Sequence, residues 1–246
     1  MITQWYLTGD CHGDFTRFYK LNQAVPEGEG WGVIVLGDAG FNFWLSKSEQ
    51  KMKKRIAYSY PNLVFYCVRG NHEERPSNLI NVTHVFDKNV QGIIAIDPDY
   101  PHIRYLEDGF IYYINNKKTL ILGGAYSIDK DYRLARAAAG GYAGWFEGEQ
   151  LTEQEMKRIE ALHSNEHFDL VLSHTCPISW EPRDLFLSFI DQSKVDKSME
   201  LWMEQFKDKI TFSQWCFGHF HDDRIINDKA QMLYKDIKFL DDILIL

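Results

Sequence analysis

The stretch WCFGHFHDD, Trp215 to Asp223, places two histidines directly after a run apolar enough to be a buried strand. Gly218 separates that run from His219 and His221. On an extended segment, residues two positions apart point to the same side and lie roughly 6.6 Å apart, too far to meet at one point. Either the backbone turns at the glycine, or the pair serves two ions that lie side by side. A lone histidine after a strand is more often a hydrogen-bonded core residue, so the interpretation depends on the other strand ends.

Four further apolar runs end in polar residues of similar kinds. The runs are QWYLT (4–8), GVIVL (32–36), NLVFYCV (62–68) and FDLVLS (168–173). Their lack of polar alternation is typical of strands covered on both faces. The polar residues that follow them are Asp10, His12, Asp38, Asn71, His72 and His174. Because α/β proteins form their sites at the carboxyl ends of strands, the five coincidences together predict a metal site.

Helix signals lie between these runs. Asp14 is placed to cap a helix, SKSE (46–49) is a capping box, and Thr152 with Glu155 forms a second box. Another helix is expected around Met199 and Trp202. Alternating strands and helices predict a sheet with helices packed outside it.

The middle of the chain lacks helix signals. GIIAI, HIRYL, FIYYI and TLILGG follow one another with short breaks, which predicts consecutive strands connected by hairpins. The tail predicts a hairpin around Asn227–Asp228 and a final strand in IKFLDDILIL. Since no linker or change of composition interrupts the sequence, we expect one domain over residues 1–246 that contains two sheets.

Composition narrows the function classes. The net charge of −8 argues against a dedicated nucleic-acid-binding surface, but a nucleotide or other phosphoester remains compatible with a metal-lined cleft. The four cysteines show no CxxC spacing, which favours reduced buried thiols. The N-terminus resembles no signal peptide, and no apolar run approaches the roughly 20 residues that span a membrane. A cytoplasmic protein without a membrane partner is therefore expected.

The ordered motifs resemble the calcineurin-like metallophosphoesterases. The blocks GDCHGD, GDAG, GNHE, SH and GHFH occur in order from Gly9 to His221. The resemblance implies a four-layer α/β/β/α sandwich and two divalent metal ions at the sheet edges, with Mn expected first and Fe, Zn or Ni as alternatives. The ligands it implies are Asp10, His12 and His221 for one ion, Asn71, His174 and His219 for the other, and Asp38 bridging both.

The implied reaction is hydrolysis of phosphomonoesters or phosphodiesters by a metal-bridging hydroxide. Asp38 and His72 are the expected catalytic residues, His72 protonating the leaving oxygen or stabilising charge on the phosphoryl group. Asn71 and His72 are expected to contact substrate, as are Arg69 and Arg133, the latter on a segment that could cover the site.

The sequence also departs from the protein serine/threonine phosphatase branch of this family. That branch has GDxVDRG where this chain has GDAGFN, so Phe41 and Asn42 replace an aspartate and an arginine. Members that cleave nucleotides, nucleic acids or other phosphoesters are therefore the closer comparison. The opposing hypothesis is a non-catalytic binding scaffold of the same fold, although degeneration should first erase ligands, and none is missing.

Overall fold

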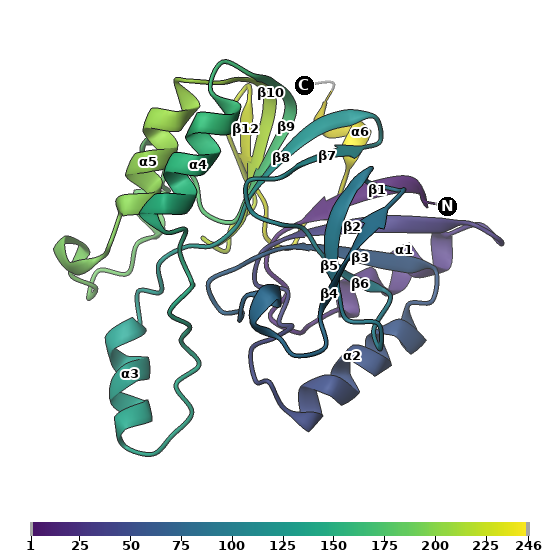
Figure 1. The fold of residues 1–246 in the computed structure, drawn as a ribbon, viewed down its shortest axis with the longest axis horizontal. Coiled ribbons are helices and arrows are strands. Elements are labelled where there is room, and N and C mark those ends of the chain that lie inside the picture. Colours follow the sequence, from purple (N-terminus) through teal and green to yellow (C-terminus); the bar gives the residue numbers. More distant parts are fainter. Residues whose placement is uncertain (1, 245–246) are drawn as a thin grey trace.

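The structure is a computed structural model that describes residues 2–244 and contains two mixed β-sheets packed face to face (Figure 1). The first sheet has the order β13-β1-β2-β3-β6-β5-β4 and the second the order β11-β12-β10-β9-β8-β7. The strands of the first sheet are β1 (Ile2–Thr8), β2 (Gly30–Leu36), β3 (Leu63–Val68), β4 (Thr83–Asp87), β5 (Gly92–Ile96), β6 (Ile103–Tyr105) and β13 (Lys238–Phe239). Those of the second are β7 (Ile111–Ile114), β8 (Lys117–Leu122), β9 (His167–Ser173), β10 (Thr211–Phe217), β11 (Arg224–Asn227) and β12 (Ala230–Met232).

Helices cover the outer faces of the two sheets, which gives the expected layering (Figure 1). Beside the first sheet lie α1 (Tyr19–Ala24) and α2 (Lys47–Ser59), and beside the second lie α4 (Glu153–His163) and α5 (Ser198–Lys207). The helix α3 (Lys130–Ala138) projects away from both sheets, and α6 (Leu240–Ile243) lies near the C-terminus. Short 3₁₀ turns occupy Thr16–Phe18, Pro76–Asn78, Ile178–Trp180, Arg183–Leu185 and Gln192–Lys194.

Three clusters of buried apolar residues separate the layers. The cluster between the sheets joins Leu7 and Ile34 of the first sheet to Leu172 and Cys216 of the second. The other two clusters fill the space between each sheet and its helices. This arrangement explains the uniformly apolar strands, because each central strand has one face on the shared core and one under helices. All four cysteines are buried free thiols, as predicted.

The predicted caps at α2 and α4 are present, the one at α2 only in part, whereas the predicted cap at Asp14 is wrong. Asp14 accepts from the Thr16 N–H, but Phe15 and Phe18 precede the 3₁₀ turn and α1, and neither start has a side-chain cap. Thr152 and Glu155 form a complete capping box at α4. At α2 the Ser46 side chain accepts from the Glu49 N–H, but the Glu49 carboxylate turns away from Ser46. It accepts instead from the backbone N–H groups of the preceding loop, at Asn42, Trp44 and Leu45.

The expected hairpins in the middle of the chain are only partly correct. The pairs β5–β6 and β7–β8 are antiparallel, but β6 and β7 belong to different sheets. The Leu106 N–H still bonds Cys67 of the first sheet, whereas the Gly109 N–H bonds Ile121 of the second. The sequence pattern is similar on both sides of this crossing because each strand buries two side chains, Ile103 and Tyr105 of β6 under the helices of the first sheet and Tyr112 and Ile114 of β7 between the sheets. The edge strand β4 was not predicted.

The predicted hairpin at Asn227–Asp228 is present as β11–β12. The predicted final strand is wrong beyond its first two residues, since α6 follows β13 directly. Leu240 and Ile243, three residues apart, both reach the core between the sheets, which a helix achieves and an extended strand does not. The last two residues of that predicted strand, 245–246, lie outside the described residues.

Candidate metal centre

The carboxyl ends of five strands converge at one edge of the two sheets. The strands β1, β2 and β3 are mutually parallel in the first sheet, and β9 and β10 are parallel in the second. Parallel neighbours end at the same edge, and the shared core brings the two edges together. The polar residues predicted from the sequence therefore meet in space although they span residues 10 to 221.

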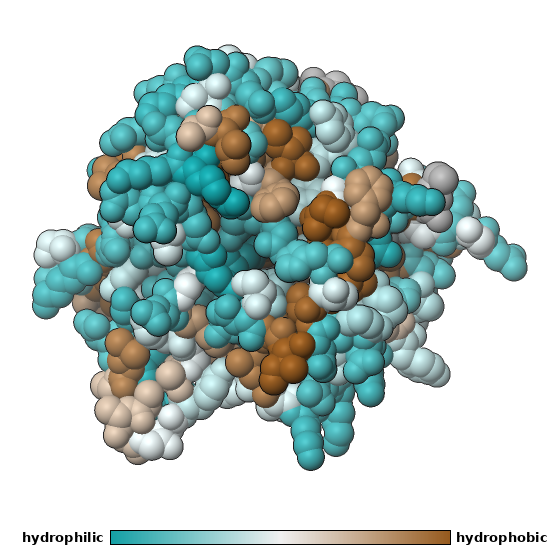
Figure 2. Space-filling model, viewed as in Figure 1, coloured by the Kyte–Doolittle hydropathy of each residue, from teal (hydrophilic) through white to brown (hydrophobic). Residues whose placement is uncertain are grey.

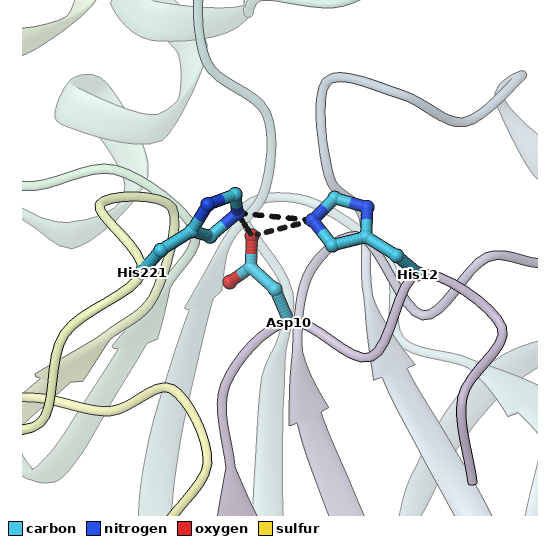
Figure 3. Close-up of side chains that lie close together, drawn as sticks. All are labelled: Asp10, His12 and His221. Atoms are coloured by element: carbon cyan, nitrogen blue, oxygen red, sulfur yellow. Dashed lines mark hydrogen bonds and ion pairs between the residues drawn. The ribbon is translucent and has the colours of Figure 1, made fainter. Parts of the chain in front are cut away.

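The first group consists of Asp10, His12 and His221 (Figure 3). The two histidines face each other above the Asp10 carboxylate, with their Nε2 atoms 2.9 Å apart. Asp10 Oδ2 lies 3.2 Å from His221 Nε2 and 3.6 Å from His12 Nε2. These three atoms point into one small space, as the ligands of a single ion do.

The second group consists of Asp10, Asp38 and His174, all buried. His174 Nδ1 lies 2.7 Å from the Leu36 carbonyl oxygen, so this nitrogen carries the proton and Nε2 presents a lone pair. His174 Nε2 lies 3.8 Å from Asp38 Oδ2 and 2.9 Å from Asn71 Oδ1. A nitrogen lone pair and two oxygens facing each other in a buried space form a ligand set for a cation.

Asn71 and His219 both contact His174 of the second group. The Asn71 amide donates from Nδ2 to Ser127 Oγ at 2.9 Å, which turns Oδ1 toward His174. The His219 ring packs edge-on against the His174 ring, with centroids 4.9 Å apart. Burial holds the pKa of His219 well below its ordinary value, so the ring is neutral, as a metal ligand must be.

In Asp10 and in Asp38, a backbone N–H group binds one carboxylate oxygen, and the other oxygen faces the imidazoles. The His219 N–H donates to Asp10 Oδ1 at 2.9 Å, and the His72 N–H donates to Asp38 Oδ1 at 2.9 Å. In both residues Oδ1 is thus anchored by the loop after a different strand, whereas Oδ2 faces the imidazoles. Such anchoring orients a carboxylate for metal binding.

Glycines make this close approach of backbone to carboxylate possible. A Cβ atom on Gly218 would lie 2.6 Å from Asp10 Oδ1, and one on Gly70 would lie 1.9 Å from Asp38 Oδ1. These glycines therefore precede the ligand loops for a steric reason.

The alternation of His219 and His221 is also explained. Both residues adopt left-handed conformations, with φ of 69° and 57°, so the chain turns after Gly218 and is not extended. His12 and Asp38 share this conformation, with φ of 47° and 48°. Four left-handed residues at one locus are characteristic of strained functional loops.

The two central carboxyls have opposite pKa shifts. Burial alone would raise the pKa of Asp10, but His174 and the hydrogen bond from His221 bring it below its ordinary value. Burial, followed by the charge of Asp10, raises the pKa of Asp38 well above its ordinary value. Burial lowers the pKa of His12, His174 and His219, whereas the hydrogen bond to Asp10 raises that of His221. The site thus brings two buried carboxyls together with mainly neutral imidazoles, and cations would complete its charge balance.

His72 and Arg133 lie at the open side of the centre. His72 Nε2 is 4.0 Å from Asp38 Oδ2 and 3.5 Å from Arg133 Nη2. Arg133, on α3, also donates to Asp129 Oδ1 and to the Gly144 carbonyl oxygen. Burial and the Arg133 charge lower the pKa of His72 to about 3.

The structure corrects the expectation for Arg69. Its side chain is only 5% exposed, and four of its five N–H groups are engaged: Nε by Asp108, and the terminal nitrogens by the carbonyls of Gly123, Gly148 and Glu149. The guanidinium therefore ties the end of β3 to the following loops and has most of its donors engaged within the protein.

Sequence reasoning did not single out two supporting residues. Glu73 accepts from the N–H groups of Gly40 and Gly70 through separate oxygens, each at 3.1 Å, and so clamps the Asp38 loop to the Asn71 loop. The Glu73 side chain is buried, and burial with the charge of Asp38 raises its pKa to about 8. The motif GNHE contains this residue, which is the signal that points to it.

Tyr234 supports His221 of the first group. Its ring stacks on the His221 ring with centroids 4.8 Å apart, and Arg17 donates to its carbonyl oxygen at 2.5 Å. Nothing in the local sequence indicates this contact, because it depends on how the C-terminal segment folds back.

With the geometry established, comparison with known proteins identifies the family. The sequence profile described as calcineurin-like phosphoesterase matches residues 6–223. The chain belongs to the calcineurin-like phosphoesterase family. Among curated proteins, the sequence comparison finds no match. Within residues 2–244, no helix combines the length and apolar character that crossing a membrane requires.

The donor set fits the two metal ions that calcineurin-like phosphoesterases typically use. Carboxylate, carboxamide and imidazole donors suit borderline and hard divalent ions. The two groups share Asp10, and the unpaired acceptors at His174 Nε2 and Asn71 Oδ1 face each other. The seven expected ligands lie around this pair of groups or in the loops that carry them.

Proposed function

We propose that residues 1–246 act as a single phosphoesterase domain with two metal ions. The observation that carries this proposal is the convergence of Asp10, Asp38 and His174 with the facing pair His12 and His221. Asp10, His12 and His221 would hold one ion, with Asn71, His174 and His219 holding the other and Asp38 bridging. When bound, such ions lower the pKa of a water molecule and neutralise phosphate charge.

The reaction supported by this site is hydrolysis of a phosphomonoester or phosphodiester. A water oxygen bonds to phosphorus, the bond from phosphorus to the ester oxygen breaks, and the departing oxygen takes a proton to give an alcohol. Positioning and charge neutralisation supply most of the acceleration in such reactions.

His72 and Arg133 are the proposed groups on the phosphate side. In the free chain His72 is neutral, and its Nε2 faces the Asn71 and Arg133 donors at 3.3 and 3.5 Å. A phosphate between His72 and Arg133 would favour the protonated imidazole, since an adjacent anion raises a histidine pKa. The protonated ring then donates to the phosphoryl group or the leaving oxygen.

A protein serine/threonine phosphatase is the less favoured enzyme. Asn42, at the position of that branch's arginine, is buried and accepts from Lys53 Nζ at 2.6 Å and from the Tyr105 hydroxyl at 3.2 Å. The Phe41 side chain is fully buried as well. Neither residue presents a charge to a phosphate.

An activity screen against metals tests the proposal. We expect the wild-type protein with Mn²⁺ to hydrolyse p-nitrophenyl phosphate or bis-p-nitrophenyl phosphate, and Asp38→Asn and His174→Ala to abolish this activity while far-ultraviolet circular dichroism is retained. The matched control is His84→Ala, an exposed histidine outside the site. Wild-type protein that binds no transition metal and cleaves neither ester with added Mn²⁺ would support the non-catalytic scaffold instead.

A further inference from the structure

A cavity of about 660 Å³ opens beside the proposed metal centre. One end of it is formed by Asp38, Asn71, His72, His219 and His221. The rest of its wall comes mainly from residues 126–129 and 181–197, two segments that contain none of the expected metal ligands. On the face seen in Figure 2, the molecule is hollowed near its middle, and hydrophobic residues flank the hydrophilic hollow.

The wall contributed by residues 185–190 is apolar. Leu187 and Phe189 line the cavity and are 48% and 78% exposed, so water reaches both apolar side chains in the absence of a ligand. Phe186 stacks on Phe220, the residue between the two histidine ligands, with ring centroids 6.3 Å apart. The apolar wall is therefore continuous with the metal-ligand loop, and a ligand's apolar group would remove it from water.

The charged residues of the cavity are mostly acidic. Asp129, Glu181, Asp196 and Asp222 line it, together with the buried Glu200. Lys197 is the single lysine or arginine among the described lining residues, and its ammonium group already lies 2.6 Å from Glu181. Asp129 and Asp222 are likewise paired, with Arg133 and Arg224. A negatively charged organic group would therefore find no unpaired cation among the described lining residues.

We propose that the phosphoester substrate carries an apolar organic group without negative charge, and that this group binds against residues 186–189 and Phe220. This inference rests on the proposed phosphoesterase function and specifies its substrate class. It disfavours substrates whose organic part bears further phosphates or carboxylates, including nucleoside polyphosphates and nucleic-acid strands. Two observations support this occupant, namely the continuity of the wall with the metal centre and the charge of the cavity.

Binding of non-hydrolysable phosphonates to the Mn²⁺-loaded full chain tests the inference without requiring turnover. Methylphosphonate reports the phosphate site alone, hexylphosphonate adds an apolar chain, and 6-phosphonohexanoate ends a chain of similar length in a carboxylate. By isothermal titration calorimetry we expect hexylphosphonate to bind at least tenfold more tightly than methylphosphonate, and 6-phosphonohexanoate to lose most of that gain. In the double variant Leu187→Ser, Phe189→Ser, the affinity for hexylphosphonate should exceed that for methylphosphonate by less than about threefold.

The matched control is Ile80→Ser, which removes a fully exposed apolar side chain outside the cavity and should leave the ratio unchanged. Equal affinities for methylphosphonate and hexylphosphonate would overturn the apolar subsite even in an active phosphoesterase. Equal affinities for hexylphosphonate and 6-phosphonohexanoate would overturn the charge selection. Tighter binding of hexylphosphonate by a protein that hydrolyses no ester would contradict the proposed function and leave the apolar subsite intact.

Discussion

The Nε2 atoms of His12 and His221 lie 2.9 Å apart although 209 positions separate the residues in the chain. One histidine follows β1 in the first sheet and the other follows β10 in the second, so their contact joins the two sheets at the site edge. Asp10 Oδ2 lies within 3.6 Å of both rings. This ligand group can therefore form only where the two sheets pack against each other.

Replacing His221 should remove one arm of this group. We expect His221→Ala to reduce Mn²⁺ content from two ions toward one per chain and to weaken Mn²⁺ binding by more than the roughly 10–100-fold that loss of an outer-shell partner causes. Metal analysis after gel filtration and calorimetric titration measure both quantities. His84→Ala is the matched control, because its side chain is 49% exposed against 48% for His221. Equal metal content in the two variants would argue against the ligand role.

A methyl group at Gly218 should disturb the centre through Asp10. The Cβ of Gly218→Ala would lie 2.6 Å from Asp10 Oδ1, the oxygen that the His219 N–H binds. Mn²⁺ affinity should fall about 10–100-fold, as expected when the support of a ligand is lost. Gly92→Ala makes a similar 2.6 Å clash with Tyr112, away from the site, and should lower stability without changing Mn²⁺ affinity. Identical affinities in the two variants would contradict this steric role.

Arg69 should matter for stability and not for substrate contact. Arg69→Ala leaves Asp108 without its 2.8 Å ion pair and the Gly123 carbonyl without the Arg69 donor. The Gly148 and Glu149 carbonyls each lose one donor and keep another, from Arg75 and from the Ala125 N–H. Breaking a buried pair in this way destabilises by about 3–5 kcal/mol, measurable by urea unfolding of the metal-loaded chain. The exposed Arg136→Ala on α3 should change stability by less than about 0.5 kcal/mol. If Arg69→Ala left the stability unchanged and raised KM, the result would instead support the hypothesis that Arg69 contacts the phosphate.

Glu200 should make stability depend on pH. Burial raises the pKa of this α5 carboxyl from 4.5 to about 7, against the opposing effects of its hydrogen bond from Thr175 and the charge of Lys197, with Glu181 adding to the rise. Because the folded pKa is raised, the contribution to stability is complete below about pH 4.5 and is lost as the pH rises through 7. The loss is on the order of 3 kcal/mol.

Glu200→Gln keeps the shape of the side chain and removes its charge. We expect the difference in unfolding free energy between the variant and the wild-type protein to grow in favour of the variant from pH 5.5 to pH 8.5. Urea unfolding at the two pH values measures this difference, in which the other titrating groups cancel. A difference that stays constant over this range would show that the carboxyl titrates normally.

The sequence could indicate candidate donors because donor chemistry is local. A glycine followed by an aspartate, asparagine or histidine at the end of an apolar run can be seen without knowing any contact. The same holds for the Thr152–Glu155 capping box, whose partners lie within one helical turn. The family resemblance then related these donors to one another across 200 residues of chain.

Other features depended on contacts between distant segments. An apolar run predicts burial but not its partner, since the hydrophobic effect is non-directional. The sequence therefore could not assign β6 and β7 to different sheets, nor show that Leu240 and Ile243 reach the core as a helix. Arg69 was equally ambiguous, because an arginine beside a site can bind either a phosphate or the protein.

The amino-acid sequence by itself thus determined the layered fold class, the order of the strand-end motifs and the chemistry of the candidate ligands, because short-range patterns encode all three. Only the tertiary structure decided which oxygen of each aspartate is free, which arginine faces the centre, and what lines the cavity beside it. Those features arise where loops from five strands and the segment 181–197 meet. Their partners come from opposite ends of the chain, so hydrogen bonds and packing between them exist only in the folded state.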